Sequence, residues 1–158
     1  VLERDCKTEF IIKTVNLTKQ SKQEFEFNIE SESDEIAKHT EPLTYIYEPN
    51  SAILKAGAFN SISSQLNIPK LHKHSHLYTS NSLIDFPGRR FKIEKSIPFN
   101  KKIFAKEKIS KANVTTRNFP ISVGEIRKKL KIKDGGDIYL FFTTDLNNIK
   151  IILVCFKA

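Results

Sequence analysis

The chain has 158 residues, of which 39% are hydrophobic and 28% are charged, and its formal net charge is +8. This composition is sufficient for a packed core and excludes an intrinsically disordered chain, because aromatic and β-branched residues are plentiful. The longest apolar stretch, 149–156, is interrupted by Lys150 and has the length of a strand. An ordinary transmembrane helix is therefore excluded as well.

The ends of the sequence give two further indications. Cys6 and Cys155 lie near opposite ends without CxxC spacing, which favours two buried, reduced thiols in a cytoplasmic protein over a disulfide. The N-terminus lacks the basic and apolar regions of a signal peptide. The sequence contains no Met and does not begin with one, from which we expect a piece of a longer protein.

Charge is distributed unevenly along the chain. Residues 1–50 hold 6 Lys and Arg against 11 Asp and Glu, whereas residues 51–158 hold 20 against 7. Opposite signs predict two modules with different surfaces, and the basic excess attracts polyanions such as nucleic acids. A lysine-rich solvated surface would give the same count, so charge alone leaves both interpretations open.

Two strands are predicted in the acidic part. Residues 6–17 have an apolar centre, and residues 24–30 alternate strictly between apolar residues and glutamates. The polar stretch 31–42 is interpreted as a linker or a short helical turn, and it marks the boundary between modules.

The region 43–88 contains a short strand, a helix and an irregular stretch. The strand covers 43–48, and Asn50 or Ser51 then caps a helix over 51–66, in which apolar residues recur at helical spacing. The remaining residues of this region are irregular and end in a Phe-Pro-Gly turn.

The basic part alternates strands and helices. Strands are predicted at 89–97, 112–117, 138–144 and 149–156, and helices at 101–109 and 123–130. Asn100 caps the first helix, and Ser122 with Glu125 forms a capping box for the second. This order predicts an α+β fold in which helices pack on a mixed sheet.

Two motifs have weak chemical interpretations. His72, His74 and His76 alternate like metal ligands, but no acidic residue or Cys lies nearby as a fourth ligand, which favours a turn anchored by His76. The Gly-Gly pair within 134–137 lacks a phosphate-loop pattern, which favours a helix C-cap and turn. No nucleophile–base pair or paired carboxylates emerge, so we expect a binding module without catalytic or metal-ligating residues.

Basic and polar residues form a candidate nucleic-acid surface. Alternation places Lys111, Asn113, Thr115 and Arg117 on one strand face, where their donors suit phosphate oxygens, and the nearby Phe119 could stack on a base. A solvated polar strand face is the alternative. Further basic residues could extend the surface from a helix end and from a strand: Arg127, Lys128, Lys129, Lys131, Arg89, Arg90 and Lys92, together with Lys101 and Lys102.

Several long motifs resemble a known family. They are YIYEPNSAILKAGAF (45–59), NIPKLHKHSHLYTS (67–80), FPGRRF (86–91) and KANVTTRNFPISVGEIRKKLKIKDGGDIYLFFTT (111–144). Together they resemble the THUMP-like domain at the C-terminus of a family of bacterial class I S-adenosylmethionine-dependent methyltransferases. Residues 1–41, with ERDCK at 3–7, resemble more weakly the ferredoxin-like segment that precedes it. The predicted domains are therefore 1–41 and 42–158.

The resemblance implies a function at one remove, because a shared fold does not establish function. THUMP domains proper help RNA-modifying enzymes to bind RNA, so tRNA or rRNA is the implied partner. The glycine-rich loop for S-adenosylmethionine would lie upstream, and nothing in this sequence matches it. Motif positions carried over as an RNA-binding surface or turn anchor are His76, Tyr78, Lys111, Asn113, Thr115, Arg117 and Asn118.

Two functions are compatible with these observations. The first is a non-catalytic C-terminal part of an RNA methyltransferase that binds or positions the RNA substrate. The alternative is a structural module that packs on the methyltransferase domain of the same chain or on a protein partner, which requires a large exposed apolar patch.

Overall fold

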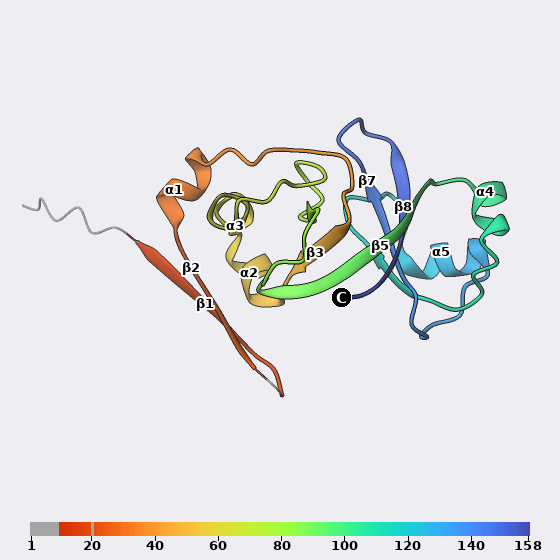
Figure 1. The fold of residues 1–158 in the computed structure, drawn as a ribbon, viewed down its shortest axis with the longest axis horizontal. Coiled ribbons are helices and arrows are strands. Elements are labelled where there is room, and N and C mark those ends of the chain that lie inside the picture. The colour runs from red at the N-terminus through yellow and green to blue at the C-terminus, as the bar shows by residue number, and fades with distance from the viewer. Residues whose placement is uncertain (1–9, 20) are drawn as a thin grey trace, which may run out of the picture.

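Two sheets organise the chain, which a computed structural model describes over residues 10–19 and 21–158 (Figure 1). β1 (Ile11–Leu17) and β2 (Lys22–Asn28) form an antiparallel hairpin that projects from one end of the molecule. The second sheet has six strands in the order β4-β3-β5-β8-β7-β6. Its neighbours are antiparallel except β6 and β7, which are parallel. The predicted α+β class with a mixed sheet is confirmed.

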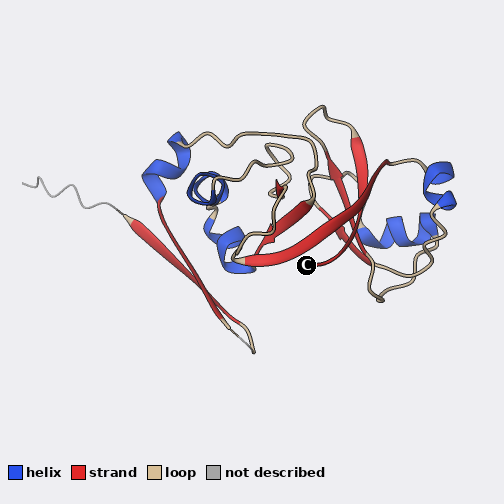
Figure 2. Ribbon diagram, in the orientation of Figure 1, coloured by secondary structure: helices blue, strands red, loops and turns tan. Residues whose placement is uncertain are grey.

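The remaining elements follow in chain order (Figure 2). The strands of the large sheet are β3 (Tyr45–Pro49), β4 (Tyr78–Ser80), β5 (Gly88–Pro98), β6 (Asn113–Thr116), β7 (Tyr139–Thr144) and β8 (Lys150–Lys157). The helices are α1 (Ile29–Asp34), α2 (Ser51–Ala56), α3 (Phe59–Leu66), α4 (Lys101–Lys106) and α5 (Val123–Leu130). The three-residue strand β4 lies in a region predicted to be irregular.

Helix starts follow the predicted caps. The Asn50 side chain accepts hydrogen bonds from the first amides of α2, and Asn100 does the same for α4. Ser122 and Glu125 form the reciprocal capping box of α5. These caps were predictable because the capping side chain and the amides it satisfies lie within three residues of each other.

The predicted helix over 51–66 is instead two helices. Gly57 adopts a left-handed φ of 79° and ends α2, and α3 begins two residues later. Ala58, at the N-cap of α3, has no side chain that could accept a hydrogen bond. The Glu32 carboxylate takes this role and accepts from the amides of Asn60 at 2.6 Å and Ser61 at 2.7 Å. The stretch 31–42, predicted as a linker or a short helical turn, therefore begins within α1, and Glu32 bonds this helix to α3.

Three apolar cores cover the two faces of the large sheet. On one face, α2, α3 and the hairpin bury one core, and α4 and α5 bury another (Figure 1). On the opposite face, the strands pack against two leucines of the histidine-containing segment, Leu71 and Leu77. The strands β7 and β8 are consequently buried on both faces, which accounts for their nearly continuous apolar sequences. Cys155 lies in this core, whereas Cys6 lies outside the described residues.

A register shift in β5 lets this strand contribute side chains to two of the three cores. The pairing with β8 is irregular between Ile93 and Lys95. Before the shift, Phe91 and Ile93 face the third core, and after it Ile97 faces the core under α4 and α5. An extra residue reverses the alternation of a strand, so this bulge allows an 11-residue strand to join two layers.

We predict that Gly88→Ala destabilises the protein by about 1–3 kcal/mol, as overpacking does elsewhere. A Cβ at Gly88 would lie 2.1 Å from the Glu48 carbonyl oxygen, so the pairing of β3 with β5 would have to shift. Gly124→Ala in α5 is the matched control, because its Cβ meets nothing within 4 Å and helix propensity favours Ala. Urea unfolding that finds Gly88→Ala as stable as wild type would contradict this account.

Candidate nucleic-acid interface

A buried carboxylate at the end of β3 binds two of the arginines that were predicted to contact RNA. Glu48 is 3% exposed. Its Oε1 accepts from Arg117 Nη2 at 2.7 Å and Nε at 2.9 Å, and its Oε2 accepts from Arg89 Nε at 2.6 Å and also contacts Arg89 Nη2. A buried carboxylate requires such partners to offset its lost hydration. Both guanidinium groups therefore bind Glu48, a residue that was not among the predicted site residues.

This contact requires the large sheet to curl. β3 and β6 are four strands apart in the sheet, which corresponds to about 19 Å in a flat sheet. Arg117, directly after β6, nevertheless reaches Glu48, and Thr115 Oγ1 lies 3.5 Å from Arg89 Nη2. Three predicted site residues from β5 and β6 thus meet on one face of the curled sheet.

The other end of the predicted strip secures a turn. Asn113 Nδ2 donates to the Gly136 carbonyl at 2.7 Å, and the aliphatic part of Lys111 lies against Gly135. Lys131, with a φ of 57°, ends α5, so the two glycines form the turn into β7 and do not cap the helix as predicted. Asn113 and Lys111 therefore have a structural role in this turn, although the Lys111 side chain remains at the surface.

Asn118 joins the strip to the histidine segment. Its amide nitrogen lies 2.9 Å from His72 Nδ1, while His72 Nε2 lies 3.2 Å from Asn148 Oδ1. The adjacent Phe119 packs edge-on against Phe99 and Phe142, with ring centroids 5.0 and 5.6 Å away. Phe119 is partly buried and packs against the core under α4 and α5, so stacking of its ring on a base stays a prediction.

The two predicted anchors both contact Phe59. The His76 ring stacks on the Phe59 ring at 3.7 Å, and its backbone φ is 51°. Burial, with further contributions from Lys70 and Arg117, lowers the pKa of His76 to about 4, so the ring is neutral at pH 7. Tyr78 is fully buried and donates to the Phe59 carbonyl at 2.7 Å, and burial raises its pKa. Both residues thus hold the histidine segment against α3.

Arg90 and Lys92 lie apart from this face. Alternation along β5 points them away from Arg89 and Phe91. Arg90 Nη1 lies 3.6 Å from the exposed carboxylate of Asp85, and Lys92 is exposed. The predicted basic residues therefore do not form one continuous patch.

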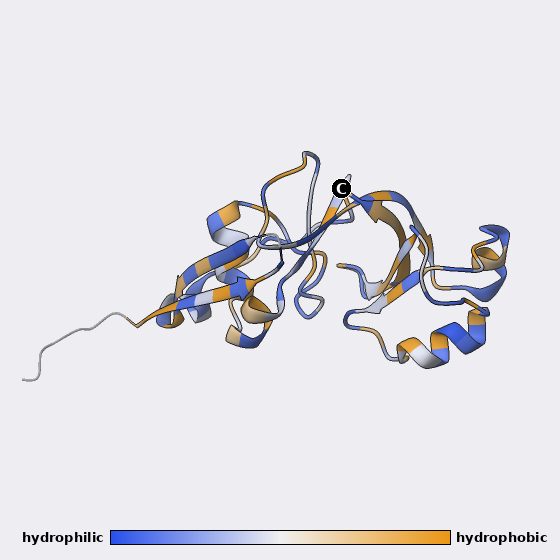
Figure 3. Cartoon of the chain, turned by 90° about the horizontal axis from the view of Figure 1, so that it is seen from below, coloured by the Kyte–Doolittle hydropathy of each residue, from blue (hydrophilic) through white to orange (hydrophobic). Residues whose placement is uncertain are grey.

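Free positive charge gathers instead on α4 and α5. These helices contact each other at one end of the molecule, and both carry hydrophilic residues on their outer surfaces (Figure 3). Eight exposed lysines on or directly after them, here called the lysine layer, are Lys101, Lys102, Lys106, Lys108, Lys128, Lys129, Lys131 and Lys133. Within the described part of the chain, none of the eight forms an ion pair, whereas the neighbouring Arg127 bonds Asp134 at 2.5 Å.

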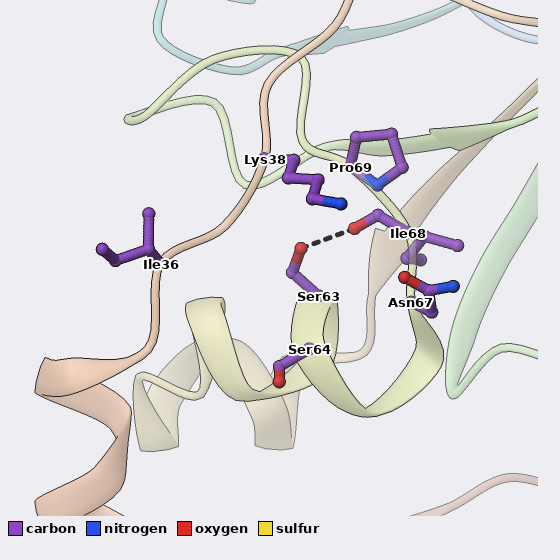
Figure 4. Close-up of a pocket in the computed structure, with 7 residues that line it drawn as sticks. All are labelled: Ile36, Lys38, Ser63, Ser64, Asn67, Ile68 and Pro69. Carbon is purple, nitrogen blue, oxygen red and sulfur yellow. Dashed lines mark hydrogen bonds between the residues drawn. The ribbon is translucent and has the colours of Figure 1, made fainter.

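Pockets in this structure are small or open. Figure 4 shows one of about 200 Å³ beside α3, where the Ser63 hydroxyl already donates to the Ile68 carbonyl at 2.5 Å. A second, of about 260 Å³, lies between α4 and α5 and is lined by Lys108 and Lys131 of the lysine layer. Across residues 10–19 and 21–158, three or more His, Cys, Asp or Glu side chains never gather as a metal site would require. No described helix is long and apolar enough to span a membrane.

Comparison with known proteins matches these elements to two domain models. Residues 45–87 match a ferredoxin-like domain model, and residues 88–157 match a model described as THUMP domain-like. This chain joins a ferredoxin-like to a THUMP-like domain. A crystal structure of a "putative methyltransferase from Porphyromonas gingivalis W83" is 38% identical over 94% of the chain, with a TM-score of 0.88. The chain spans only 38% of that protein's length. No curated protein matches it.

The two matches meet at Gly88, the first residue of β5. The ferredoxin-like match begins at residue 45, downstream of the range 1–41 in which the sequence placed that segment, and the division at residue 41 stays a prediction. β3 and β4 of the ferredoxin-like domain pair with β5 of the THUMP-like domain or with each other. One sheet therefore runs through both domains, and Glu48 binds both arginines across the boundary.

We predict that Glu48→Gln lowers the free energy of unfolding by about 1–3 kcal/mol. This is less than the 3–5 kcal/mol typical of a fully buried pair, because Arg89 and Arg117 are 50% and 34% exposed and water can solvate them. Asp85→Asn, which removes an exposed partner of Arg90, is the matched control and should change stability by less than about 0.5 kcal/mol. Equal losses for both variants in urea unfolding would show that the Glu48 contacts do not hold the two domains together.

Proposed function

We propose that this chain is the non-catalytic C-terminal part of an S-adenosylmethionine-dependent RNA methyltransferase, and that it binds and positions the RNA substrate. The observation that carries the proposal is the lysine layer. Eight exposed ammonium groups without carboxylate partners among the described residues form a surface suited to phosphates.

The THUMP-like domain is the basic part of the chain. Residues 88–157 hold 17 Lys and Arg against 6 Asp and Glu. Two of these arginines share the single negative charge of Glu48, whereas the lysines of α4 and α5 have no ion-pair partner among the described residues. Phosphate contacts of this kind orient a nucleic acid without reading its sequence. Recognition of a tRNA or rRNA would then rest on the shape of the folded RNA, as is common for RNA helices.

Methyl transfer belongs to another part of the protein in this proposal. S-adenosylmethionine would bind in an upstream domain, which corresponds to the length of the P. gingivalis protein beyond the match. The strip of Lys111, Asn113, Thr115, Arg117 and Asn118 remains a predicted secondary contact, because its side chains also serve the fold.

We predict that Lys128→Glu combined with Lys131→Glu weakens tRNA binding by at least about tenfold at low salt. Each lost phosphate contact should also reduce the slope of log affinity against log salt concentration by about 0.7–0.9. Fluorescence titration with bulk tRNA and with a DNA duplex of equal charge, each at two salt concentrations, measures both quantities.

Lys55→Glu is the control for this experiment. Lys55 is exposed on α2, outside the lysine layer, so its reversal changes net charge without removing the proposed contacts. Equal losses for the control and the layer variants, or equal binding of tRNA and duplex DNA, would reduce the lysine layer to a generic positive charge.

The alternative, a docking module, has its own supporting observation. The outer face of β1 exposes Ile11, Val15 and Leu17, which are 63%, 42% and 75% exposed. Lys13 lies between Ile11 and Val15 on this face and pairs with Glu24 and Glu26 of β2, so apolar and charged residues alternate there. Clustered exposed apolar residues on a monomer are typical of an interaction surface. The occupant we propose is the methyltransferase domain, because the matched relative extends well beyond the region that this chain covers. The two functions are compatible, since the hairpin and the lysine layer lie at opposite ends of the molecule (Figure 1).

We predict that Val15→Lys combined with Leu17→Lys abolishes binding of this chain to the remainder of the P. gingivalis protein, produced separately. Leu83→Lys, at another exposed leucine, is the control and should leave binding intact. Analytical ultracentrifugation of the mixtures decides the matter: unchanged binding by the hairpin variant, or no binding by wild type, would remove the docking role.

A further inference from the structure

A hollow of about 510 Å³ lies between α1, the start of α3 and the histidine segment. Its lining includes Lys70, Lys73, His74 and His76 from the histidine segment, with Phe59 from α3. Neither the ferredoxin-like match nor the proposed RNA surface assigns a role to this hollow. Its volume is within the range of small-molecule sites.

Lys70 is the unusual residue of this hollow. It is 2% exposed, and its ammonium donates to the Lys73 carbonyl at 3.1 Å. Among the described residues, no carboxylate lies within 4 Å of it. Burial lowers the pKa of Lys70, and the charge of Glu32, more than 4 Å away, opposes this shift. The Lys70 Nζ also lies 5.9 Å from the centroid of the Phe59 ring. A buried ammonium without an ion-pair partner is costly, and two of its three donors remain for another partner.

The backbone holds Lys70 in this place. Its amide donates to the Lys38 carbonyl at 2.8 Å, and its carbonyl accepts from the Thr40 amide at 3.0 Å. These bonds fix the main chain of Lys70 beside the hollow, and the bond to the Lys73 carbonyl holds its ammonium there. A fixed cation beside a hollow is preorganised for an anionic ligand.

The acidic residues of the lining that the structure describes form no ion pair with this cation. Glu32 is bonded to the amides of Asn60 and Ser61 at the start of α3. Burial and the neighbouring Glu32 raise the pKa of Glu35. Lys70 also contributes to the lowered pKa values of His39 and His76, as expected where the local potential is positive.

We propose that this hollow binds a phosphate monoester, with Lys70 as its buried counter-charge and the exposed Lys73 and His74 at its rim. A dianionic group suits several donors around one cation better than a carboxylate does. The volume exceeds the needs of a phosphate alone, and Phe59 with the stacked His76 offers an aromatic wall for an organic group. The proposal does not depend on RNA binding by the lysine layer, since the two sets of residues do not overlap.

The test is calorimetric titration of the whole chain with adenosine 5′-monophosphate, adenosine and inorganic phosphate at constant ionic strength. The monophosphate should bind and adenosine should not. Lys70→Met should weaken binding by at least about tenfold, as expected for loss of a charge-assisted hydrogen bond. It should also raise the melting temperature without ligand, because an uncompensated buried charge has been removed. Lys55→Met, on the exposed face of α2, should change neither property.

Two further arms complete the test. The first arm compares a 5′-phosphorylated RNA dinucleotide with its 5′-hydroxyl form. Tighter binding of the phosphorylated dinucleotide identifies the ligand as an RNA 5′ end. Tighter binding of adenosine 5′-monophosphate than of either dinucleotide identifies it as a free metabolite. If Lys70→Met does not fold, Lys70→Arg replaces it, and NMR records the shifts of the His74 and His76 ring signals when adenosine 5′-monophosphate is added to wild type. No binding of either phosphate compound by wild type at about 10 mM, equal binding by the Lys70 variant, or unmoved histidine signals would overturn the proposal.

Discussion

The contact of Glu48 with Arg89 and Arg117 is the constraint on which the rest of the structure depends. A carboxylate that is almost fully buried must be paired, and its two partners come from the neighbouring strand β5 and from the end of β6 at the far edge of the sheet. The sheet can satisfy this pairing only by curling, so that the end of β6 approaches β3. Curling also encloses the core that Leu71 and Leu77 complete, and it holds the histidine segment in place. The ferredoxin-like and THUMP-like domains are thereby joined by charge as well as by strand pairing.

The same contact divides the basic residues into two classes. Arg89 and Arg117 balance a buried charge, and an RNA phosphate would have to compete with Glu48 for them. The lysines of α4 and α5 have no carboxylate among the described residues that would compete with a phosphate for them. Phe104 and Ile126 bury the apolar faces of these two helices, and the lysines project from the exposed faces. Lys70 is a third kind of cation, because it is buried and no carboxylate of the described residues lies within 4 Å of it. A count of positive charge cannot separate these three environments, although they imply different chemistry.

Features that depend on neighbours in the sequence were predictable. Asn50, Asn100 and the Ser122–Glu125 box cap their helices, because a cap and its amides lie within one turn. The alternation of β2 and the apolar runs of β7 and β8 likewise report burial directly. The break at Gly57 was missed, because apolar residues continue at helical spacing across it, and the cap of the second helix comes from the distant Glu32. The contacts of Phe119 with Phe99 and Phe142 were not predictable for a related reason, because an aromatic residue after a polar strand has the same sequence whether it faces solvent or a core.

The sequence by itself determined most of the helices and strands, the mixed α+β class and the family resemblance, all of which arise from local patterns and long ordered motifs. Only the tertiary structure decided which charges are free. Ion pairing depends on atoms a few ångströms apart in space, and Glu48 lies 41 and 69 residues from its two partners along the chain. The burial of Lys70 likewise follows from its pairing with residues 38–40 and its packing beside α3, which no window of sequence around it contains. Burial and long-range pairing set the cost of each charge, and both are properties of the folded chain.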